Sequence, residues 1–294
     1  MKTTSWLDWD TIKLMRIPFS FFLMPIYWFA LSQTYPIDWF PAILCFIILH
    51  LFIYPASNGY NSYMDKDETS IGGLKNPPKV TKKLFYVSIA FDVIGLWLAL
   101  LVNINFFYCV GLYLLASRAY SYKGIRLKKY PIIGFLTVVF FQGAFTYLMV
   151  KTSLNPMIDL HLSYQWRAML ACSFLIGGVY PLTQVYQHTA DLASGDRTIS
   201  ILLGIRGTFI FSAIMFGIAN MVLYFHFQEV QRSFQYLIFQ ICLSPLVIYF
   251  GWWAIKVWKN KSEASFENTM RMNAISSLAM SMCFILMCVL NYYK

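Results

Sequence analysis

Three carboxylates lie within four residues of a chain that has only 13 Asp and Glu among its 294 residues. They are Asp65, Asp67 and Glu68, and they directly follow a long apolar run. On a continuing helix, Asn61, Asp65 and Glu68 are spaced i, i+4 and i+7 and share one face, with Asp67 opposite. Amide and carboxylate oxygens suit Mg²⁺, which commonly takes one or two carboxylates together with water and substrate phosphates. The stretch therefore predicts a metal site, and a solvated acidic helix end is the alternative.

A second polar cluster follows a later apolar run, four such runs further along the chain. Gln184, Gln187 and Asp191 are spaced i, i+3 and i+7, so on a helix they would again share a face. Asp65 and Asp191 are 126 residues apart. Two polar helix ends in matching positions suggest two similar halves, each of which supplies one wall of a cavity on the cytoplasmic side. The repetition favours a metal site over two unrelated solvated ends.

Basic residues lie beside both clusters. Lysines follow the first cluster, and a basic loop with several tyrosines occupies residues 118–129. These cations can bind a diphosphate or can simply fix the orientation of the chain in a membrane, and the loop can face lipid headgroups or a charged substrate. Arg16 allows the same two interpretations. Asp92 lies inside an apolar run, where an ionisable residue is a functional candidate unless a partner satisfies it.

The elements that must position these side chains are predicted to be membrane-spanning helices. The chain is 59% hydrophobic and only 12% charged, against roughly 25% charged residues in soluble domains. Apolar runs of about 17–22 residues are long enough to cross the hydrocarbon core as helices. They lie at residues 17–34, 40–57, 84–102, 106–122, 131–150, 167–187, 207–227, 235–256 and 272–291. We therefore expect one all-α integral membrane domain over residues 1–294.

The formal net charge of +10 indicates orientation in a membrane and gives no support for nucleic-acid binding, because the 23 Lys and Arg lie between the apolar runs and not on one basic face. When they are sorted by alternate loops, most fall on the side that holds the N-terminus and both polar clusters. The positive-inside rule then predicts a cytoplasmic N-terminus and an external C-terminus. We expect the protein in a bacterial inner membrane.

Two stretches of this sequence resemble motifs of the UbiA superfamily of intramembrane prenyltransferases. The first family motif is Asn-x-x-x-Asp-x-x-x-Asp, followed by a basic residue and proline. Asn61 and Asp65 match it, Thr69 occupies the third position, and residues 75–77 resemble the tail. Residues 120–128 are similar to the family element Tyr-Ser-x-x-x-x-Arg-x-Lys.

The second family motif is Asp-x-x-x-Asp, followed by Gly-x-Arg/Lys-Thr and a later Leu-Gly. The residues that match it are Asp191, Gly195, Arg197, Thr198, Leu203 and Gly204. Gln187 stands at the first aspartate of this motif, as Thr69 stands at the last aspartate of the other. Asp67, Glu68 and Asp196 are close enough in sequence to compensate, or the number of Mg²⁺ ions differs from that of the family.

The resemblance implies nine transmembrane helices around a central cavity, arranged as two four-helix halves plus a ninth helix. It implies that Asp65 and Asp191 are catalytic, because they hold Mg²⁺ against a prenyl diphosphate. The implied metal ligands are Asn61, Asp65, Asp67, Glu68, Gln187, Asp191 and Asp196. The implied substrate-binding residues are Arg16, Asn58, Lys75, Lys79, Tyr120, Lys123, Arg126, Lys128, Gln184 and Arg197.

The function that this resemblance implies is Mg²⁺-dependent transfer of a prenyl group from its diphosphate to a lipophilic, aromatic acceptor. If the prenyl chain's own double bond attacks the allylic cation, the protein is an intramembrane terpene cyclase. A non-enzymatic protein that binds a phospholipid or an isoprenoid is the third alternative. Asp65 and Asp191 argue against it, since phosphate binding alone needs cations and amides more than metal-binding carboxylates.

Overall fold

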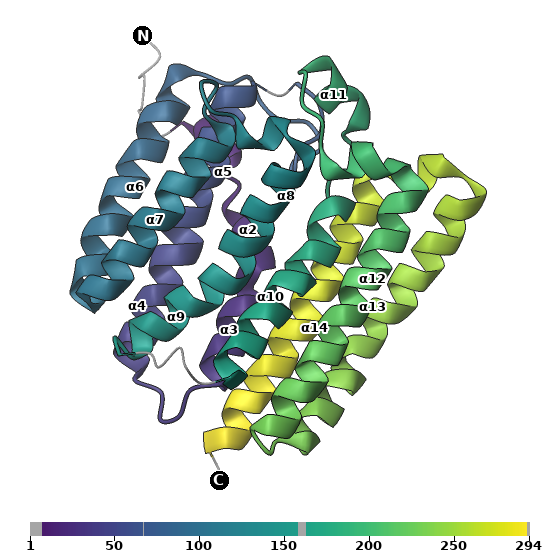
Figure 1. Cartoon of the computed structure of the whole chain (residues 1–294). Helices are drawn as coiled ribbons and strands as arrows, with labels where there is room; N and C mark the ends of the chain where they lie inside the picture. Colours follow the sequence, from purple (N-terminus) through teal and green to yellow (C-terminus); the bar gives the residue numbers. More distant parts are fainter. Residues whose placement is uncertain (1–7, 67, 158–162, 293–294) are drawn as a thin grey trace.

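The structure is a computed structural model that describes residues 8–66, 68–157 and 163–292. Within these residues the regular elements are all helices, and the only β-type pairing is an isolated bridge between Ile71 and Leu74. Long helices run side by side as a bundle, with the loops gathered at its two ends (Figure 1). The predicted all-α architecture is confirmed.

The N-terminal part of the bundle contains two interrupted helical segments followed by two uninterrupted helices. The first segment comprises α1 (Trp9–Met15), α2 (Ile17–Ser20), η1 (Phe21–Leu23) and α3 (Met24–Ser32). The second segment comprises α4 (Trp39–Ile47), η2 (Ile48–Ile53) and α5 (Tyr54–Asp65). The two uninterrupted helices are α6 (Lys82–Val102) and α7 (Ile104–Ser121).

The rest of the bundle begins with the short turn η3 (Leu127–Lys129), which precedes a third interrupted segment. This segment comprises α8 (Pro131–Val139), η4 (Phe140–Phe145) and α9 (Thr146–Leu154). The elements that follow are α10 (Ser163–Leu182), α11 (His188–Ala193), α12 (Ile199–Glu229), α13 (Ser233–Lys259), η5 (Lys261–Glu263) and α14 (Phe266–Tyr292).

Seven helical stretches of the described chain are long and apolar enough to cross a membrane. They are Trp9–Ser32, Trp39–Asp65, Lys82–Val102, Pro131–Leu154, Ile199–Glu229, Ser233–Lys259 and Phe266–Tyr292. The two other expected spans correspond to α7 and α10, which are helices of 18 and 20 residues. An 18-residue helix is about 27 Å long, close to the thickness of the hydrocarbon core.

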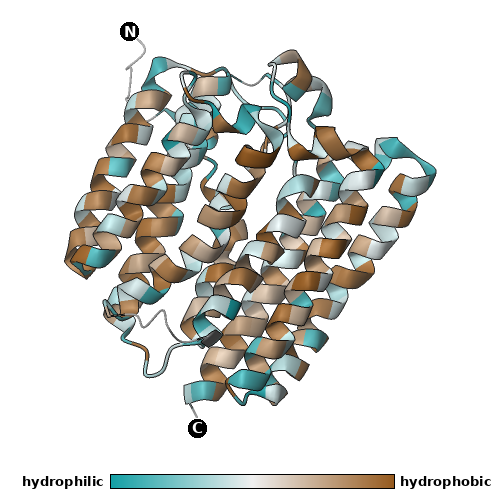
Figure 2. Cartoon of the chain, viewed as in Figure 1, coloured by the Kyte–Doolittle hydropathy of each residue, from teal (hydrophilic) through white to brown (hydrophobic). Residues whose placement is uncertain are grey.

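Hydrophobic residues predominate along the middle of the long helices, and hydrophilic residues are more frequent toward the loops (Figure 2). Large hydrophobic side chains are exposed on α6, α7, α12 and α13, among them Trp97, Leu101, Leu115, Ile210 and Ile248. In a soluble protein so much exposed apolar surface would promote aggregation. It is the surface expected of helices that face lipid, so the chain has the character of an integral membrane protein.

Helices from the beginning and the end of the chain pack side by side in the bundle. The last long helix, α14, packs against α13 and against α3, and α3 also packs against α9. On either side of these contacts, α10 packs on α12 and α5 packs on α6. This arrangement lets side chains from α2, α5, α7, α10 and α14 face a common interior.

The third segment is interrupted by a π-helical turn, η4, where α10 comes very close. A Cβ on Gly143 would lie 2.6 Å from Ser173 Cα, so only glycine permits this approach. The Ser173 hydroxyl accepts a hydrogen bond from Ala144 N and donates one to Val139 O, both at 3.1 Å. The hydroxyl thereby pairs backbone groups that the π turn leaves out of the helical ladder. Gln142, in the same turn, is directed into the interior of the bundle.

Candidate functional site

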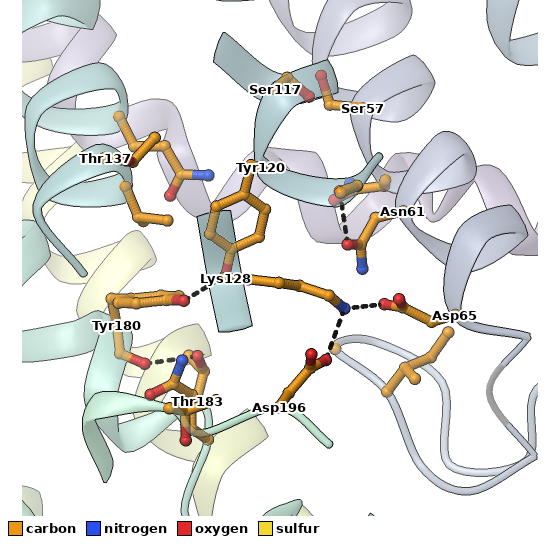
Figure 3. A pocket seen from close by; sticks show the side chains of 18 of the residues that line it. Ser57, Asn61, Asp65, Ser117, Tyr120, Lys128, Thr137, Tyr180, Thr183 and Asp196 are labelled. Carbon is orange, nitrogen blue, oxygen red and sulfur yellow. Dashed lines mark hydrogen bonds and ion pairs between the residues drawn. The ribbon is translucent and has the colours of Figure 1, made fainter. Parts of the chain in front are cut away.

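A polar cavity of about 220 Å³ lies at the end of the bundle that carries the N-terminus. Figure 3 shows side chains of α5, α7, η3 and α10, and of the segment after α11, directed into it. Ten of the predicted site residues line this cavity. They are Arg16, Asn58, Asn61, Asp65, Tyr120, Lys128, Gln184, Gln187, Asp191 and Asp196. The structure thus brings both predicted polar clusters to one place.

Two carboxylates and two cations form an ion-pair network in this cavity. Arg126 Nε lies 2.7 Å from Asp196 Oδ1, and Arg126 Nη2 lies 2.9 Å from Asp196 Oδ2. Lys128 Nζ contacts Asp65 and lies 3.3 Å from Asp196 Oδ2, so one ammonium group bridges the two carboxylates (Figure 3). Arg126 Nη1 lies 3.4 Å from Asp65 Oδ1. The basic loop before α8 therefore joins a carboxylate from each predicted cluster.

The four charged side chains of the network are largely shielded from solvent. The Asp65 and Asp196 side chains are 7% and 5% exposed, and those of Arg126 and Lys128 are 16% and 12% exposed. Charges at such positions interact more strongly than on an open surface, and removal of one partner leaves the other uncompensated. A polyanionic ligand entering here would meet both cations and both carboxylates.

Helix α5 ends at Asp65, because Lys66 adopts a left-handed conformation with φ of 53°. Asn61 and Asp65 therefore share a helix face as predicted, but Glu68 lies beyond the helix, so its predicted place on that face is wrong. Glu68 is exposed. The Asn61 side chain accepts a hydrogen bond of 2.8 Å from Ser121 Oγ on α7, which holds the amide at the cavity wall.

The second cluster is also less regular than predicted. Helix α10 ends at Leu182 and α11 begins at His188. Gln184 and Gln187 lie in the turn between these helices, so the prediction of one continuous helix face is wrong, although both side chains still line the cavity. Partial burial lowers the pKa of His188 and so disfavours the charged form of this ring beside the cavity.

Hydrogen bonds from two side chains hold the loop after α5 against the rest of the cavity. Gln187 Nε2 donates a hydrogen bond of 3.0 Å to Ser70 O, which ties the second cluster to the loop of the first. Arg16 donates to Asn58 O at 2.9 Å and to Gly72 O at 3.4 Å. Arg16 separates α1 from α2 with a left-handed φ of 51° and is buried. Its guanidinium group thus joins α5 to the loop that follows it, at the wall of the cavity.

Several predicted residues are not brought to the cavity. Lys75 is exposed and forms an ion pair with Glu267. Lys79, Lys123 and Arg197 are exposed, and none of them is among the cavity-lining residues. Asp67 lies outside the described residues. Arg126 is not a lining residue either, but it reaches the site through its contacts with Asp65 and Asp196.

Asp92 has a structural partner. It forms an ion pair with Arg118 of α7, and the Arg118 guanidinium carbon lies 4.0 Å from the centre of the Tyr60 ring. Neither Asp92 nor Arg118 lines the cavity. The pair stabilises the packing of α5, α6 and α7 behind the cavity wall, which favours the structural interpretation of Asp92.

The donor atoms fit Mg²⁺ bound together with a phosphate ligand, and not a closed protein cage. Among the described residues there is no group of three or more His, Cys, Asp or Glu that could hold a metal. Asp65 Oδ1 is nevertheless buried without a hydrogen bond, and the cavity also holds the Asn61 amide and the Asp191 carboxylate. Mg²⁺ commonly takes one or two carboxylates and fills its remaining positions with water and substrate phosphates.

A second cavity of about 200 Å³ adjoins the polar cavity, and we call it the apolar chamber. The two share lining residues that include Phe19, Ser57, Tyr113 and Tyr180. At their junction the Tyr120 hydroxyl is hydrogen-bonded to the Tyr180 hydroxyl. A ligand with a charged end and an apolar body could therefore occupy both spaces at once.

Sequence reasoning missed several lining residues. Four residues that line one or both cavities were predicted only as parts of apolar runs and not as site residues. They are Ser57, Gln142, Tyr180 and Asn273. Gln142 and Asn273 could have been predicted, because each is an amide inside an apolar run. An amide that faces lipid is energetically unfavourable, so such a residue is expected to face the interior of the bundle.

Comparison with known proteins decides the family. A model described as the UbiA prenyltransferase family matches residues 22–275. The chain belongs to the UbiA prenyltransferase family. The resemblance of its motifs to this family is thereby confirmed, with Thr69 and Gln187 as departures from the usual aspartates. No curated protein sequence matches this UbiA-family protein.

Solved structures share the fold of this UbiA-family protein at low sequence identity. A UbiA homologue from Archaeoglobus fulgidus bound to DMAPP and Mg²⁺ is 16% identical, with a TM-score of 0.69 over 95% of this chain and 99% of that one. The apo UbiA homologue from Aeropyrum pernix K1 is 17% identical, with a TM-score of 0.67 over 90% and 97%. A digeranylgeranylglyceryl phosphate synthase structure is 18% identical, with a TM-score of 0.59 over 95% and 96%.

Proposed function

We propose that this UbiA-family protein is a Mg²⁺-dependent intramembrane prenyltransferase that ionises a prenyl diphosphate and transfers the prenyl group to a lipophilic acceptor. The observation that carries the proposal is the continuity of the two cavities. The polar cavity holds Asp65, Asp191, Asp196 and Lys128, and the apolar chamber adjoins it directly. A diphosphate fits the first and a hydrocarbon chain fits the second. The solved homologue with DMAPP and Mg²⁺ supports this assignment.

The metal would be held by Asn61, Asp65 and Asp191, with Asp196 close by. As a Lewis acid it supplies charge neutralisation for the leaving diphosphate. Lys128 and Arg126 supply further positive charge beside the same oxygens, and this charge gains importance as the bond from carbon to oxygen lengthens. The electron pair of that bond leaves with the diphosphate, so both cations stabilise the product side of the ionisation step.

The apolar chamber protects the allylic cation from water. Its wall includes the rings of Phe19, Tyr113 and Tyr180 next to the polar cavity. Aromatic faces stabilise a cation without reacting with it as readily as water does. The acceptor then forms a new bond to the prenyl carbon and loses a proton to the released diphosphate.

We also propose an orientation of the protein in the membrane. All nine predicted spans cross the membrane, α7 and α10 among them, with the polar cavity and the N-terminus on the cytoplasmic side. The basic loop with Arg126 and Lys128 lies at this end, as the positive-inside rule requires. Soluble prenyl diphosphates would then enter from the cytoplasm.

The test is a diphosphate-release assay with purified protein in lipid nanodiscs. Geranyl diphosphate and dimethylallyl diphosphate are supplied with Mg²⁺ and with a panel of lipophilic aromatic acceptors. We expect release that stops with EDTA and resumes when Mg²⁺ is added in excess. An alkylated acceptor supports transfer. Release with a cyclic hydrocarbon product would replace transferase by cyclase, and binding of the diphosphates without any release would contradict both activities.

A further inference from the structure

The apolar chamber changes from a polar end to an apolar end. Its polar lining residues are Ser57, Asn58, Gln142 and Thr183, which also line the polar cavity and so lie at the junction, followed by Ser20, Asn273 and Ser276. The other end is lined by apolar side chains from three helices, among them Ile26 on α3, Ile176 on α10 and Met280 on α14. This end suits a hydrocarbon, because a polar group buried there would lose its hydrogen bonds to water.

Three aromatic residues, Phe29, Phe284 and Tyr147, close the apolar end, and we call them the aromatic floor. Phe29 lies one turn beyond Ile26 on α3. Phe284 lies one turn beyond Met280 on α14. The Phe29 and Phe284 ring centroids are 4.9 Å apart, and the Tyr147 ring centroid lies 5.6 Å from that of Phe29. Each of the three residues is 1% exposed, and none of them lines the chamber. Close packing of this kind leaves no gap through which a hydrocarbon chain could pass.

The depth of the chamber follows from the helical segments that line it. Its lining residues extend over residues 19–26, 175–183 and 273–280 in three such segments. At about 1.5 Å of rise per residue, these stretches correspond to a depth of about 10–12 Å. A carbon–carbon bond is about 1.5 Å long, so an extended isoprene unit, with about four bonds along the chain, spans about 5 Å. Two isoprene units therefore fill the chamber, and a third unit would meet the aromatic floor.

We propose that the aromatic floor limits the length of the prenyl tail, and that the substrate of this protein carries two isoprene units, as geranyl diphosphate does. This inference rests on the proposed function, since it specifies the tail of the same substrate. The diphosphate stays in the polar cavity whatever the tail length, so the floor discriminates among substrates through the tail alone. A longer tail must displace packed rings or leave apolar carbons in the polar cavity, and both lower its affinity.

The test uses S-thiolodiphosphate analogues of geranyl and farnesyl diphosphate, which have two and three isoprene units. In these analogues sulfur replaces the oxygen that joins the tail to the diphosphate, so they bind without being ionised. They are titrated calorimetrically, with Mg²⁺, into the full-length protein in nanodiscs, and their partition into empty nanodiscs is subtracted. We expect the wild type to bind the geranyl analogue at least about tenfold more tightly than the farnesyl analogue, because the third unit overpacks the chamber.

Two variants move the closed end of the chamber in opposite directions. Phe284→Ala removes a ring that is similar in size to one isoprene unit, so the farnesyl analogue should bind as tightly as the geranyl analogue. Met280→Phe places a ring above the floor, so the geranyl analogue should bind about tenfold more weakly, while the shorter dimethylallyl analogue keeps its affinity. The control is Phe106→Ala, because Phe106 on α7 is 0% exposed but lines neither cavity. This variant should keep the preference of the wild type, and melting temperatures show whether each variant is folded.

Equal affinities of the wild type for the geranyl and farnesyl analogues would overturn the proposal. So would an unchanged preference in folded Phe284→Ala together with unchanged geranyl affinity in Met280→Phe, and if Phe284→Ala does not fold, Met280→Phe decides alone.

Diphosphate release from geranyl diphosphate with Mg²⁺ tests the proposed function separately, since the analogues report binding alone. Release without a tail preference removes only the aromatic floor as a limit on length. A tail preference without release in the wild type removes the proposed reaction and leaves the floor as the limit of a binding site.

Discussion

Arg126 and Asp196 form a two-point ion pair, with Nε 2.7 Å from Oδ1 and Nη2 2.9 Å from Oδ2, although 70 residues separate them. This geometry matches the planar guanidinium group to a carboxylate, which lysine at position 126 could not do. The pair joins the basic loop before α8 to the segment after α11. Because Arg126 Nη1 also lies 3.4 Å from Asp65 Oδ1, the same guanidinium group connects the end of α5 to the segment after α11 without a bound ligand.

We predict that Arg126→Gln destabilises the protein by about 2–3 kcal/mol. Removal of one partner of a buried ion pair commonly costs about 3–5 kcal/mol, and here Lys128 still accompanies Asp196 at 3.3 Å. The double variant Arg126→Gln with Asp196→Asn should recover part of the loss, because no charge is then left unpaired. Thermal unfolding in detergent measures all three proteins.

The matched control for this prediction is Arg167→Gln. Arg167 pairs with Glu229, but the two side chains are 40% and 29% exposed. Solvent screens such a pair, so the expected loss of stability is about 0–1 kcal/mol. Equal destabilisation by Arg126→Gln and by the double variant would show that the buried pair does not act as described.

A second prediction concerns Asp191. We expect Asp191→Asn to lower diphosphate release about 10³-fold while the protein still folds and inserts, because an amide is a weaker ligand for a divalent cation and neutralises less charge. The assay is release from geranyl diphosphate at saturating Mg²⁺, with folding checked by the melting temperature. Asp10→Asn, at an exposed site on α1, should retain full activity. Wild-type release by Asp191→Asn would exclude Asp191 from the metal site.

Part of the site could be predicted from the sequence because it depends on local order along the helices. Asn61 and Asp65 are one turn apart on α5, and a polar residue at the end of an apolar run must lie near the membrane surface. The helix ends were predicted less well. Helix α5 is followed by Lys66 in a left-handed conformation, which glycine more commonly adopts. No residue in the local sequence pattern predicts that the helix ends there.

Other features depend on contacts between distant segments. The pairing of Lys128 with Asp65 and Asp196 brings together the end of α5, the basic loop and the segment after α11. A periodic pattern carries no information about which of these segments meet. Asn273 is a polar residue in a methionine-rich apolar run, and its burial against the apolar chamber follows from the packing of α14 on α3. The family resemblance implied that Arg126 and Lys128 belong to the site, but not that they pair with Asp65 and Asp196.

A third prediction concerns Gln187, which stands where the family usually has aspartate. Gln187→Glu keeps the side-chain length but replaces the donor to Ser70 O by a carboxylate oxygen. We expect the Mg²⁺ concentration for half-maximal release to fall severalfold, because a carboxylate is added beside Asp191. The melting temperature without Mg²⁺ should fall, since the loop loses its hydrogen bond and gains repulsion.

Gln187→Ala is the control for this experiment. It removes the hydrogen bond to Ser70 O without adding a carboxylate, so it should lower the melting temperature and leave the Mg²⁺ requirement no lower than in the wild type. An equal Mg²⁺ requirement in Gln187→Glu and the wild type would mean that position 187 lies outside the reach of the metal.

The last prediction concerns the π-helical turn that directs Gln142 inward. We expect Gly143→Ala to destabilise the protein by about 1–3 kcal/mol, the usual cost of forcing a methyl group into a packed interior. The new Cβ would lie 2.6 Å from Ser173 Cα and 2.7 Å from Ser173 N. These are backbone atoms, so α10 itself must move, and it carries Tyr180 at the junction of the two cavities. Diphosphate release should therefore fall together with the melting temperature.

Gly217→Ala separates this steric effect from the general effect of replacing glycine in a helix. Gly217 lies on α12 with no atom within 4 Å of the position a Cβ would take. There alanine should stabilise the helix by about 0.5–1 kcal/mol through its higher propensity, and activity should not change. If both variants shift the melting temperature in the same direction, the close approach of η4 and α10 does not limit the packing, and the inward position of Gln142 must depend on other contacts.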